Sequence, residues 1–160
     1  VDTILDSCDG LLKFIQDRLE RDAAESKLSQ LQLEAVDLEE IIGQIIRQNL
    51  ATAHAKQQSL TCVSDLNGLP QVRADFHALG QVLGNLISNA IKFSLPGTHV
   101  RVEAALEQGT PDRVRITVHD QGPGLTVADC KDLFKPYQRL SARPTGGESS
   151  TGLGLSIAHD

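Results

Sequence analysis

Hydrophobic residues near the N-terminus recur at alternating three- and four-residue steps, at Leu5, Cys8, Leu12, Ile15 and Leu19. A repeat of about 3.5 residues is typical of the seam of a coiled coil or a helical bundle. The stripe is narrow and polar residues flank it, so a helix that carries it needs a partner. We therefore predict a long helix over residues 1–30 that pairs with other helices in a homodimer. Docking of this helix on its own domain is the alternative.

Two later apolar stripes predict amphipathic helices with a period near 3.6 residues. One helix begins after Asp37 and the other after Asp75, and both aspartates are suitable N-caps. The second helix is expected to end before Pro96. The residues expected to face the core are Leu38, Ile41, Ile42, Ile45, Ile46 and Leu50 in the first helix, and Phe76, Leu79, Val82, Leu83, Leu86, Ile87, Ala90 and Ile91 in the second.

Shorter apolar runs predict strands at residues 60–64, 99–106 and 113–119, with a turn between the last two over Gly109-Thr110-Pro111-Asp112. In the last strand, apolar and polar residues alternate, so one face of the sheet is expected to be wet or lightly covered. The predicted fold class is α+β. The expected architecture is a two-layer α/β sandwich, with helices on one face of a mixed, mostly antiparallel sheet.

Composition narrows the function classes. The net charge of −6 argues against a nucleic-acid-binding surface. The three cysteines form no C-x-x-C pair, which favours neither a zinc site nor a disulfide framework and suggests a reducing cytoplasm. No apolar run approaches the roughly 20 residues that span a membrane. Because the chain lacks Met and begins at Val1, we expect a piece of a longer protein, incomplete at its C-terminal end.

Polar residues share one face of the helix that follows Asp75. Asn85, Asn89 and Lys92 are spaced by four and then three residues, so they form a stripe opposite the buried one. Asparagine is a poor residue for a helix interior. Its carboxamide oxygen can ligate Mg²⁺, and a lysine one turn further on can reach phosphate oxygens. A solvated helix face is the alternative.

Three further clusters follow in order along the chain. Asp120-Gln-Gly122-Pro-Gly124 lies at the end of a predicted strand. A carboxylate there can accept a hydrogen bond from an exocyclic amine, and glycines allow a flat base to approach the backbone. A tight turn at the end of the strand is the alternative explanation of this motif. Phe134-Lys-Pro-Tyr137, with Arg139 beyond it, by itself indicates only an aromatic turn. The residues Thr151-Gly152-Leu153-Gly154-Leu155 precede a helix start, a position that suits a phosphate chain.

The order of these clusters is more informative than any one of them. N-x-x-x-N-A-x-K, then D-x-G-x-G, then F-x-P-Y, then G-x-G-L resembles the nucleotide-binding signature of sensor histidine kinases. These enzymes belong to the ATPase superfamily that also includes DNA gyrase B and a heat-shock chaperone, with a Bergerat-type ATP-binding fold. The resemblance implies that residues 1–30 are the second helix of the dimerisation and phosphoacceptor hairpin. It implies that residues 31–160 are the catalytic ATP-binding domain.

The resemblance assigns roles around the metal and the phosphates. Asn89 would ligate the Mg²⁺ that bridges the phosphates, with Asn85 in support. Lys92 would contact a phosphate, and Arg139 is similar to the basic residue that meets the phosphates. These four are the residues to which the resemblance gives catalytic roles.

The resemblance also implies a binding site for the base. Phe93 would pack at the adenine, Asp120 would bind its amine, and Gly122 and Gly124 would line the base pocket. Residues 138–151 would form a mobile lid over the nucleotide. The remaining expected nucleotide contacts are Tyr137, Thr151, Gly152, Leu153, Gly154 and Leu155.

The implied reaction is in-line transfer of the ATP γ-phosphoryl group to a histidine, followed by relay to an aspartate in the receiver domain of a response regulator. The family expects that histidine on the first hairpin helix, next to an acidic residue. None of the five histidines fits, so the acceptor is expected outside the chain; they are His54, His77, His99, His119 and His159. Whether the parent protein is anchored in a membrane stays open.

Two other functions compete with histidine phosphorylation. An ATP hydrolase of the same superfamily would carry a glutamate base one turn before the metal-binding asparagine. This position is Asn85, which cannot take a proton from water, so transfer is favoured over hydrolysis. The other alternative is a scaffold that dimerises and binds partners without responding to nucleotide, and the intact motifs argue against it.

Overall fold

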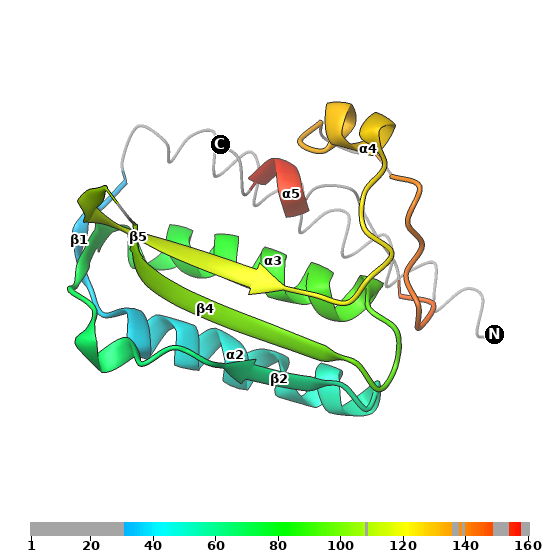
Figure 1. Cartoon of the computed structure of the whole chain (residues 1–160), viewed down its shortest axis with the longest axis horizontal. Helices are drawn as coiled ribbons and strands as arrows, with labels where there is room; N and C mark the ends of the chain where they lie inside the picture. The colour runs from blue at the N-terminus through cyan, green and yellow to red at the C-terminus, as the bar shows by residue number, and fades with distance from the viewer. Residues whose placement is uncertain (1–30, 108, 136–137, 139, 149–153, 158–160) are drawn as a thin grey trace.

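The computed structural model describes residues 31–160 except 108, 136–137, 139, 149–153 and 158–160. The predicted N-terminal helix over residues 1–30 lies outside the described residues. Within them, Figure 1 shows a sheet with two long helices packed along one of its faces. The predicted α+β class and the placement of helices on one face of a mixed sheet are confirmed.

The first long helix is α2, Leu38–Ala55. The Asp37 side chain caps it by accepting from the Glu39 amide at 2.8 Å and from the Glu40 amide at 3.4 Å. These bonds satisfy backbone donors that the first turn of a helix leaves unpaired. The predicted apolar stripe is buried at Leu38, Ile41, Ile42 and Ile45, while Ile46 and Leu50 are partly buried against the same core.

The second long helix is α3, Phe76–Phe93, which carries most of the candidate chemistry. Asp75 caps it, accepting from the Ala78 amide at 3.0 Å. That bond, and a second one from the Gln32 amide, lower the pKa of Asp75 below its ordinary value. The helix ends at Ser94, as the following Pro96-Gly97 predicts.

The main sheet has the strand order β2-β4-β5. Strand β2, Ser59–Cys62, runs parallel to β4, His99–Glu107, and β4 pairs antiparallel with β5, Thr110–His119. The predicted turn after the middle strand is too long: Thr110 already pairs with Glu107, so Pro111 and Asp112 belong to β5. Gly109 makes the tighter turn possible, since its φ of 81° is one that glycine adopts without strain.

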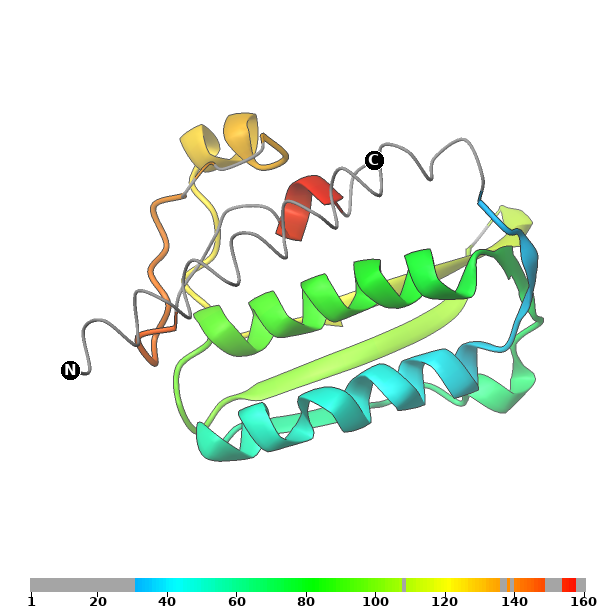
Figure 2. The ribbon, with the colours of Figure 1, turned by 180° about the vertical axis from the view of Figure 1, so that it is seen from behind.

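A second, two-stranded sheet and the short helix α4 were not predicted, whereas α5 lies at the helix start expected after the glycine motif. Strands β1, Glu34–Val36, and β3, Val72–Ala74, pair antiparallel, and they lead directly into α2 and α3. A single 3₁₀ turn, η2, covers Leu66–Gly68. Helices α4, Val127–Asp132, and α5, Gly154–Ile157, lie beyond α3 on the side away from α2 (Figure 2).

The core lies between the main sheet and the two long helices. Its largest fully buried aliphatic side chains are Ile41, Ile42, Ile87, Ile91, Val100 and Val102. Each such side chain stabilises the fold by roughly 1.5–3 kcal/mol relative to exposure. The core therefore fixes one side of α3 and leaves its other side available. No helix in the described parts of the chain is long and apolar enough to cross a membrane.

Candidate functional site

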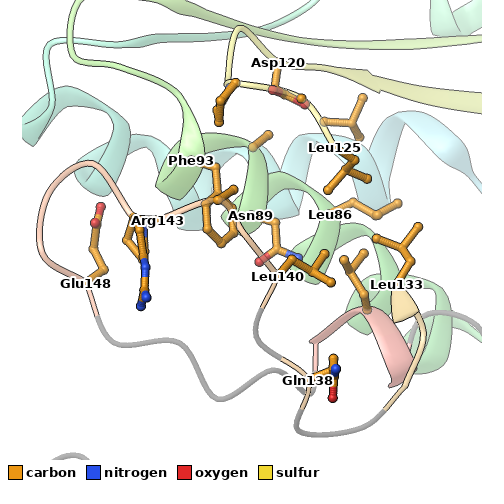
Figure 3. Close-up of a pocket in the computed structure, with 17 residues that line it drawn as sticks. Leu86, Asn89, Phe93, Asp120, Leu125, Leu133, Gln138, Leu140, Arg143 and Glu148 are labelled. Carbon is orange, nitrogen blue, oxygen red and sulfur yellow. The ribbon is translucent and has the colours of Figure 1, made fainter. Parts of the chain in front are cut away.

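A cavity of about 550 Å³ lies on the side of α3 that faces away from the core. Its walls come from α3, from the loop after β5, from the surroundings of α4 and α5, and from the segment 140–148 (Figure 3). The lining residues are Leu86, Asn89, Ala90, Phe93, Val118, Asp120, Pro123, Gly124, Leu125, Leu133, Gln138, Leu140, Ala142, Arg143, Pro144, Glu148 and Leu155. The lining is mainly apolar with a few polar groups, as in sites for small molecules.

The helical wall consists of residues spaced by three and four positions. Leu86, Asn89 and Phe93 follow one another along one face of α3 and line the cavity. Leu86 was predicted to lie in the core with Ile87, and this prediction is wrong. One side of α3 packs against the sheet and α2, and another side lines the cavity. Some apolar residues of α3 therefore lie in the core and others, such as Leu86, line the cavity.

The loop after β5 holds a carboxylate in a fixed position. Oδ1 of Asp120 accepts from the Gly122 amide at 2.7 Å. A Cβ atom on Gly122 would lie 2.9 Å from that oxygen and 3.2 Å from the Phe93 carbonyl oxygen, so any other residue here would displace the Asp120 side chain. Gly124, with a φ of 75°, also has a conformation that favours glycine. The loop thus keeps Asp120 against the end of α3, facing the cavity.

Two carboxamides lie together where α3 meets α5. A Cβ atom on Gly154 would lie 3.4 Å from Asn85 Oδ1 and 3.7 Å from Asn89 Nδ2, which places both side chains at one spot. Among the residues that the structure describes, Nδ2 of Asn85 is buried and has no hydrogen-bond partner. A buried amide that lacks a partner costs free energy unless a ligand or water supplies one. The unpaired Asn85 nitrogen is a donor, so it fits an acceptor such as a phosphate oxygen. The carboxamide oxygens of the pair are the atoms that suit Mg²⁺.

Another wall is the segment 140–148, which is tied to α4 through Asp129 and to the end of α3 through Thr145. The Asp129 carboxylate accepts from the Ser141 amide at 2.8 Å and from the Ser141 hydroxyl at 2.5 Å. It also forms the capping box of α4 with Thr126. Hydrogen bonds from Ser141 first, and then from Thr126, hold the pKa of Asp129 far below its ordinary value. The side chain stays ionised at neutral pH and anchors this wall.

The structure brings together many of the predicted site residues. Those that line the cavity are Asn89, Phe93, Asp120, Gly124 and Leu155, while Asn85, Gly122 and Gly154 lie directly beside them. The Lys92 ammonium nitrogen lies 6.0 Å from the centroid of the Phe93 ring. The predicted residues that lie outside the described part of the chain are Tyr137, Arg139, Thr151, Gly152 and Leu153.

Arg143 and Glu148 line the cavity from the segment 140–148; sequence reasoning expected this segment as part of a lid over residues 138–151 but did not single out either residue. They belong to a stretch with loop composition and no hydrophobic period, so no local pattern marks them. Within the described residues, no group of three or more His, Cys, Asp or Glu side chains could hold a metal ion. A metal ion at this site would therefore be held by the carboxamide oxygens and by oxygens of the ligand bound with it.

Residues 74–160, more than half of the chain, match the family described as histidine kinase-, DNA gyrase B- and HSP90-like ATPases. The chain belongs to this ATPase family. Relatives within it include a sensor kinase, and the structural neighbours include a mycobacterial sensor histidine kinase, MprB; the chain is an ATP-binding catalytic domain of the sensor histidine kinase type.

Two curated relatives of this ATPase domain are sensor proteins of much greater length. The chain is 34% identical over 154 residues to the virulence sensor protein BvgS of Bordetella bronchiseptica, covering 96% of the chain and 12% of BvgS. It is 31% identical over 160 residues to the autoinducer 2 sensor kinase/phosphatase LuxQ of Vibrio cholerae, covering 99% of the chain and 19% of LuxQ. The chain thus spans less than a fifth of these relatives.

Solved structures agree with this ATPase fold. Full-length ShkA, crystallised with AMPPNP, superposes with a TM-score of 0.73 at 30% identity, covering 95% of the chain and 30% of ShkA. The catalytic domain of the histidine kinase ThkA superposes with a TM-score of 0.62 at 22% identity, covering 80% of the chain and 78% of that domain. At that identity, the likeness to ThkA concerns the fold alone.

Proposed function

We propose that this domain holds Mg²⁺-ATP in the cavity beside α3 and donates the γ-phosphoryl group to a histidine outside residues 1–160. The observation that carries the proposal is that an aromatic ring, a carboxylate and a carboxamide open on one cavity, at Phe93, Asp120 and Asn89. They are the three kinds of group that an adenine base and a metal-bound triphosphate require. The crystal structure of ShkA, which is 30% identical, contains AMPPNP, and this supports a nucleotide as the ligand of the fold.

Asp120 is the proposed reader of the base. An ionised carboxylate only accepts hydrogen bonds, so it suits the exocyclic amine of adenine and disfavours the oxygen that guanine has there. The Gly122 amide donates to Oδ1 and fixes the orientation of the carboxylate, and Oδ2 is the oxygen that would accept from the base. The Phe93 ring and Leu125 supply apolar surface for the base.

Asn89 and Asn85 are the proposed metal ligands. Magnesium takes oxygen ligands and keeps several from water and phosphate, so two carboxamide oxygens suffice as the protein's share. When bound, the ion would neutralise charge that develops on the phosphates. Lys92 and Arg139 are the cations proposed from the resemblance, and Arg143 adds a guanidinium in the cavity wall. Guanidinium groups match phosphate geometry.

The proposed reaction is transfer rather than hydrolysis. A hydrolase needs a general base near the attacking water, whereas the residue one turn before Asn89 is Asn85, which cannot accept that proton. Positioning and charge neutralisation are what phosphoryl transfer requires of a protein. The proposed partners are a second copy, joined through residues 1–30, and the receiver domain of a response regulator, in the cytoplasm.

Labelled ATP tests this proposal. The 160-residue chain is incubated with γ-labelled Mg²⁺-ATP, in parallel with a longer form of the protein that extends upstream of Val1. We expect the short chain to bind ATP but to label itself weakly, and the longer form to carry acid-labile, base-stable phosphate. Equal labelling of both forms would place the acceptor among the five histidines. Release of free phosphate without protein labelling would favour the hydrolase.

A further inference from the structure

The Lys56 ammonium group gathers four acceptors although it lies outside the cavity lining. Lys56 is the C-cap residue of α2, and its side chain is only 10% exposed. Nζ lies 2.8 Å from the Ile91 carbonyl oxygen and 3.0 Å from that of Lys92, both at the end of α3. It also lies 2.7 Å from Thr145 Oγ1 and 3.0 Å from Glu148 Oε1. One ammonium group thus joins the ends of α2 and α3 to the segment 140–148, which forms a wall of the cavity.

Capping of α3 does not by itself explain this lysine. The last carbonyls of a helix need donors, and a cation there is favourable. The buried Gln58 amide already donates to the carbonyl oxygens of Ile91, Ser94 and Leu95, at 3.1, 3.0 and 3.1 Å. What Lys56 adds is the link to Thr145 and Glu148, which lie 89 and 92 positions further along the chain.

The turn 145–148 is built around that ammonium group. The Thr145 amide donates to the Lys92 carbonyl oxygen at 3.1 Å, and its hydroxyl donates to the Ser94 carbonyl oxygen at 2.6 Å. Glu148 Oε2 accepts from the Gly146 amide at 2.8 Å while Oε1 accepts from Lys56. Since Glu148 and its neighbours Arg143 and Pro144 line the cavity, the position of this turn sets the position of the wall.

The ion pair also compensates a charge that a polyanionic ligand would meet. Burial is the largest influence on Glu148 and opposes its ionisation, yet hydrogen bonds from its own amide, from Lys56 and from the Gly146 amide together lower its pKa. Glu148 is therefore a carboxylate at neutral pH, in the wall of a cavity for a nucleotide. Without the lysine, that negative charge would be unpaired and would repel a triphosphate.

We propose that Lys56 is a positioning residue for nucleotide binding: through Glu148 and Thr145 it holds the wall that carries Arg143 in place and cancels the charge of Glu148. This inference rests on the proposed function. It requires that the effect of losing Lys56 is relieved when Glu148 is neutral, because the unpaired carboxylate is then absent. A lysine that only capped α3 would show no such relief.

The test is a double-mutant cycle on the full chain, with ATP affinity measured by calorimetry. We expect Lys56→Met to weaken ATP binding about 10-fold and Lys56→Arg, which keeps the charge, to recover most of the loss. Adding Glu148→Gln to Lys56→Met should also restore affinity, by about 3-fold or more. The control is Arg115→Met, which removes a positive charge from an ion pair with Glu107 in the main sheet. The Arg115 side chain is 68% exposed, so this variant should change affinity less than about 2-fold.

Hydrogen exchange supplies a second readout. In Lys56→Met, amides of residues 140–148 should exchange faster while those of β4 and β5 stay protected. If Lys56→Met does not fold, Thr145→Val removes one acceptor of the lysine and should weaken binding several-fold with the same local loss of protection. Three results would overturn the inference: a folded Lys56→Met variant that binds ATP as well as Arg115→Met does, an absence of relief by Glu148→Gln, or unaltered ATP binding by Thr145→Val. Failure of the wild-type chain to bind ATP would instead refute the proposed function on which it rests.

Discussion

Replacement of Gly122 by alanine tests how the cavity holds its carboxylate. The added Cβ would lie 2.9 Å from Asp120 Oδ1 and 3.2 Å from the Phe93 carbonyl oxygen. The backbone of α3 cannot yield, so the Asp120 side chain must turn away and lose the 2.7 Å hydrogen bond from the residue-122 amide. A hydrogen bond to a charged group contributes roughly 1.5–3 kcal/mol. If that bond positions the base reader, ATP binding weakens by about 10- to 150-fold.

Calorimetric titration of Gly122→Ala with Mg²⁺-ATP measures this loss. The matched control is Gly84→Ala, the same substitution within α3, where a Cβ atom would meet nothing within 4 Å. The control should bind ATP as the wild type does and should be more stable by roughly 0.5–1 kcal/mol, because alanine is the better helix former. Wild-type affinity in a folded Gly122→Ala variant would refute the role given to the Asp120 position.

Three further predictions concern the metal, the core and the ion pair. Asn89→Ala should reduce the Mg²⁺-dependent part of ATP affinity by about 10-fold or more, which is the scale of a lost metal-site contact. ATP titrations of this variant in Mg²⁺ and in EDTA should then give similar affinities. An Mg²⁺ dependence as large as that of the wild type would contradict the role of Asn89 as a ligand. Ile87 is fully buried, so Ile87→Ala should lower the free energy of unfolding in urea by about 2–5 kcal/mol. Leu95 is 60% exposed, so Leu95→Ala should change the free energy of unfolding by less than about 0.5 kcal/mol. Similar losses in both variants would contradict the assigned core. The pKa of Glu148 is lowered from 4.5, so the contribution of this carboxylate to stability is complete above pH 4.5 and is lost as the pH falls through the lowered pKa. In urea titrations, the difference in unfolding free energy between the wild type and Glu148→Gln should therefore shrink below pH 4.5. A difference that does not change with pH would contradict the ion pair.

The parts of the fold that follow from local chemistry were predictable. Asp37 and Asp75 each precede an apolar stripe of helical period, and both cap the helices that the stripes predict. Strands β2, β4 and β5 were found from short apolar runs, within one to three residues of their observed ends. Strands β1 and β3 were missed because three-residue strands carry no period and form only by pairing across the chain, as Glu34 does with Ala74.

The cavity was predictable only in part, for the same physical reason. The wall on α3 and the loop at Asp120 lie in regular elements or directly after one, so spacing alone brings Asn89 and Phe93 to one face. The wall formed by the segment 140–148 depends on contacts between residues that are distant in the sequence, such as Lys56 with Glu148 and Asp129 with Ser141. No local sequence pattern encodes these contacts. Leu86 shows the limit of the helical pattern, because a stripe wide enough for the core also serves the cavity.

The central claim is that the cavity beside α3 binds ATP and that Asp120 selects its base. The most direct test is calorimetric titration of the wild-type chain with Mg²⁺-ATP and Mg²⁺-GTP, repeated with Asp120→Asn, which keeps the shape of the side chain but removes its charge. We predict that the wild type prefers ATP, and that Asp120→Asn loses roughly 1–3 kcal/mol of ATP binding and most of the preference. Equal binding of both nucleotides by the wild type, or undiminished ATP binding by Asp120→Asn, would contradict it.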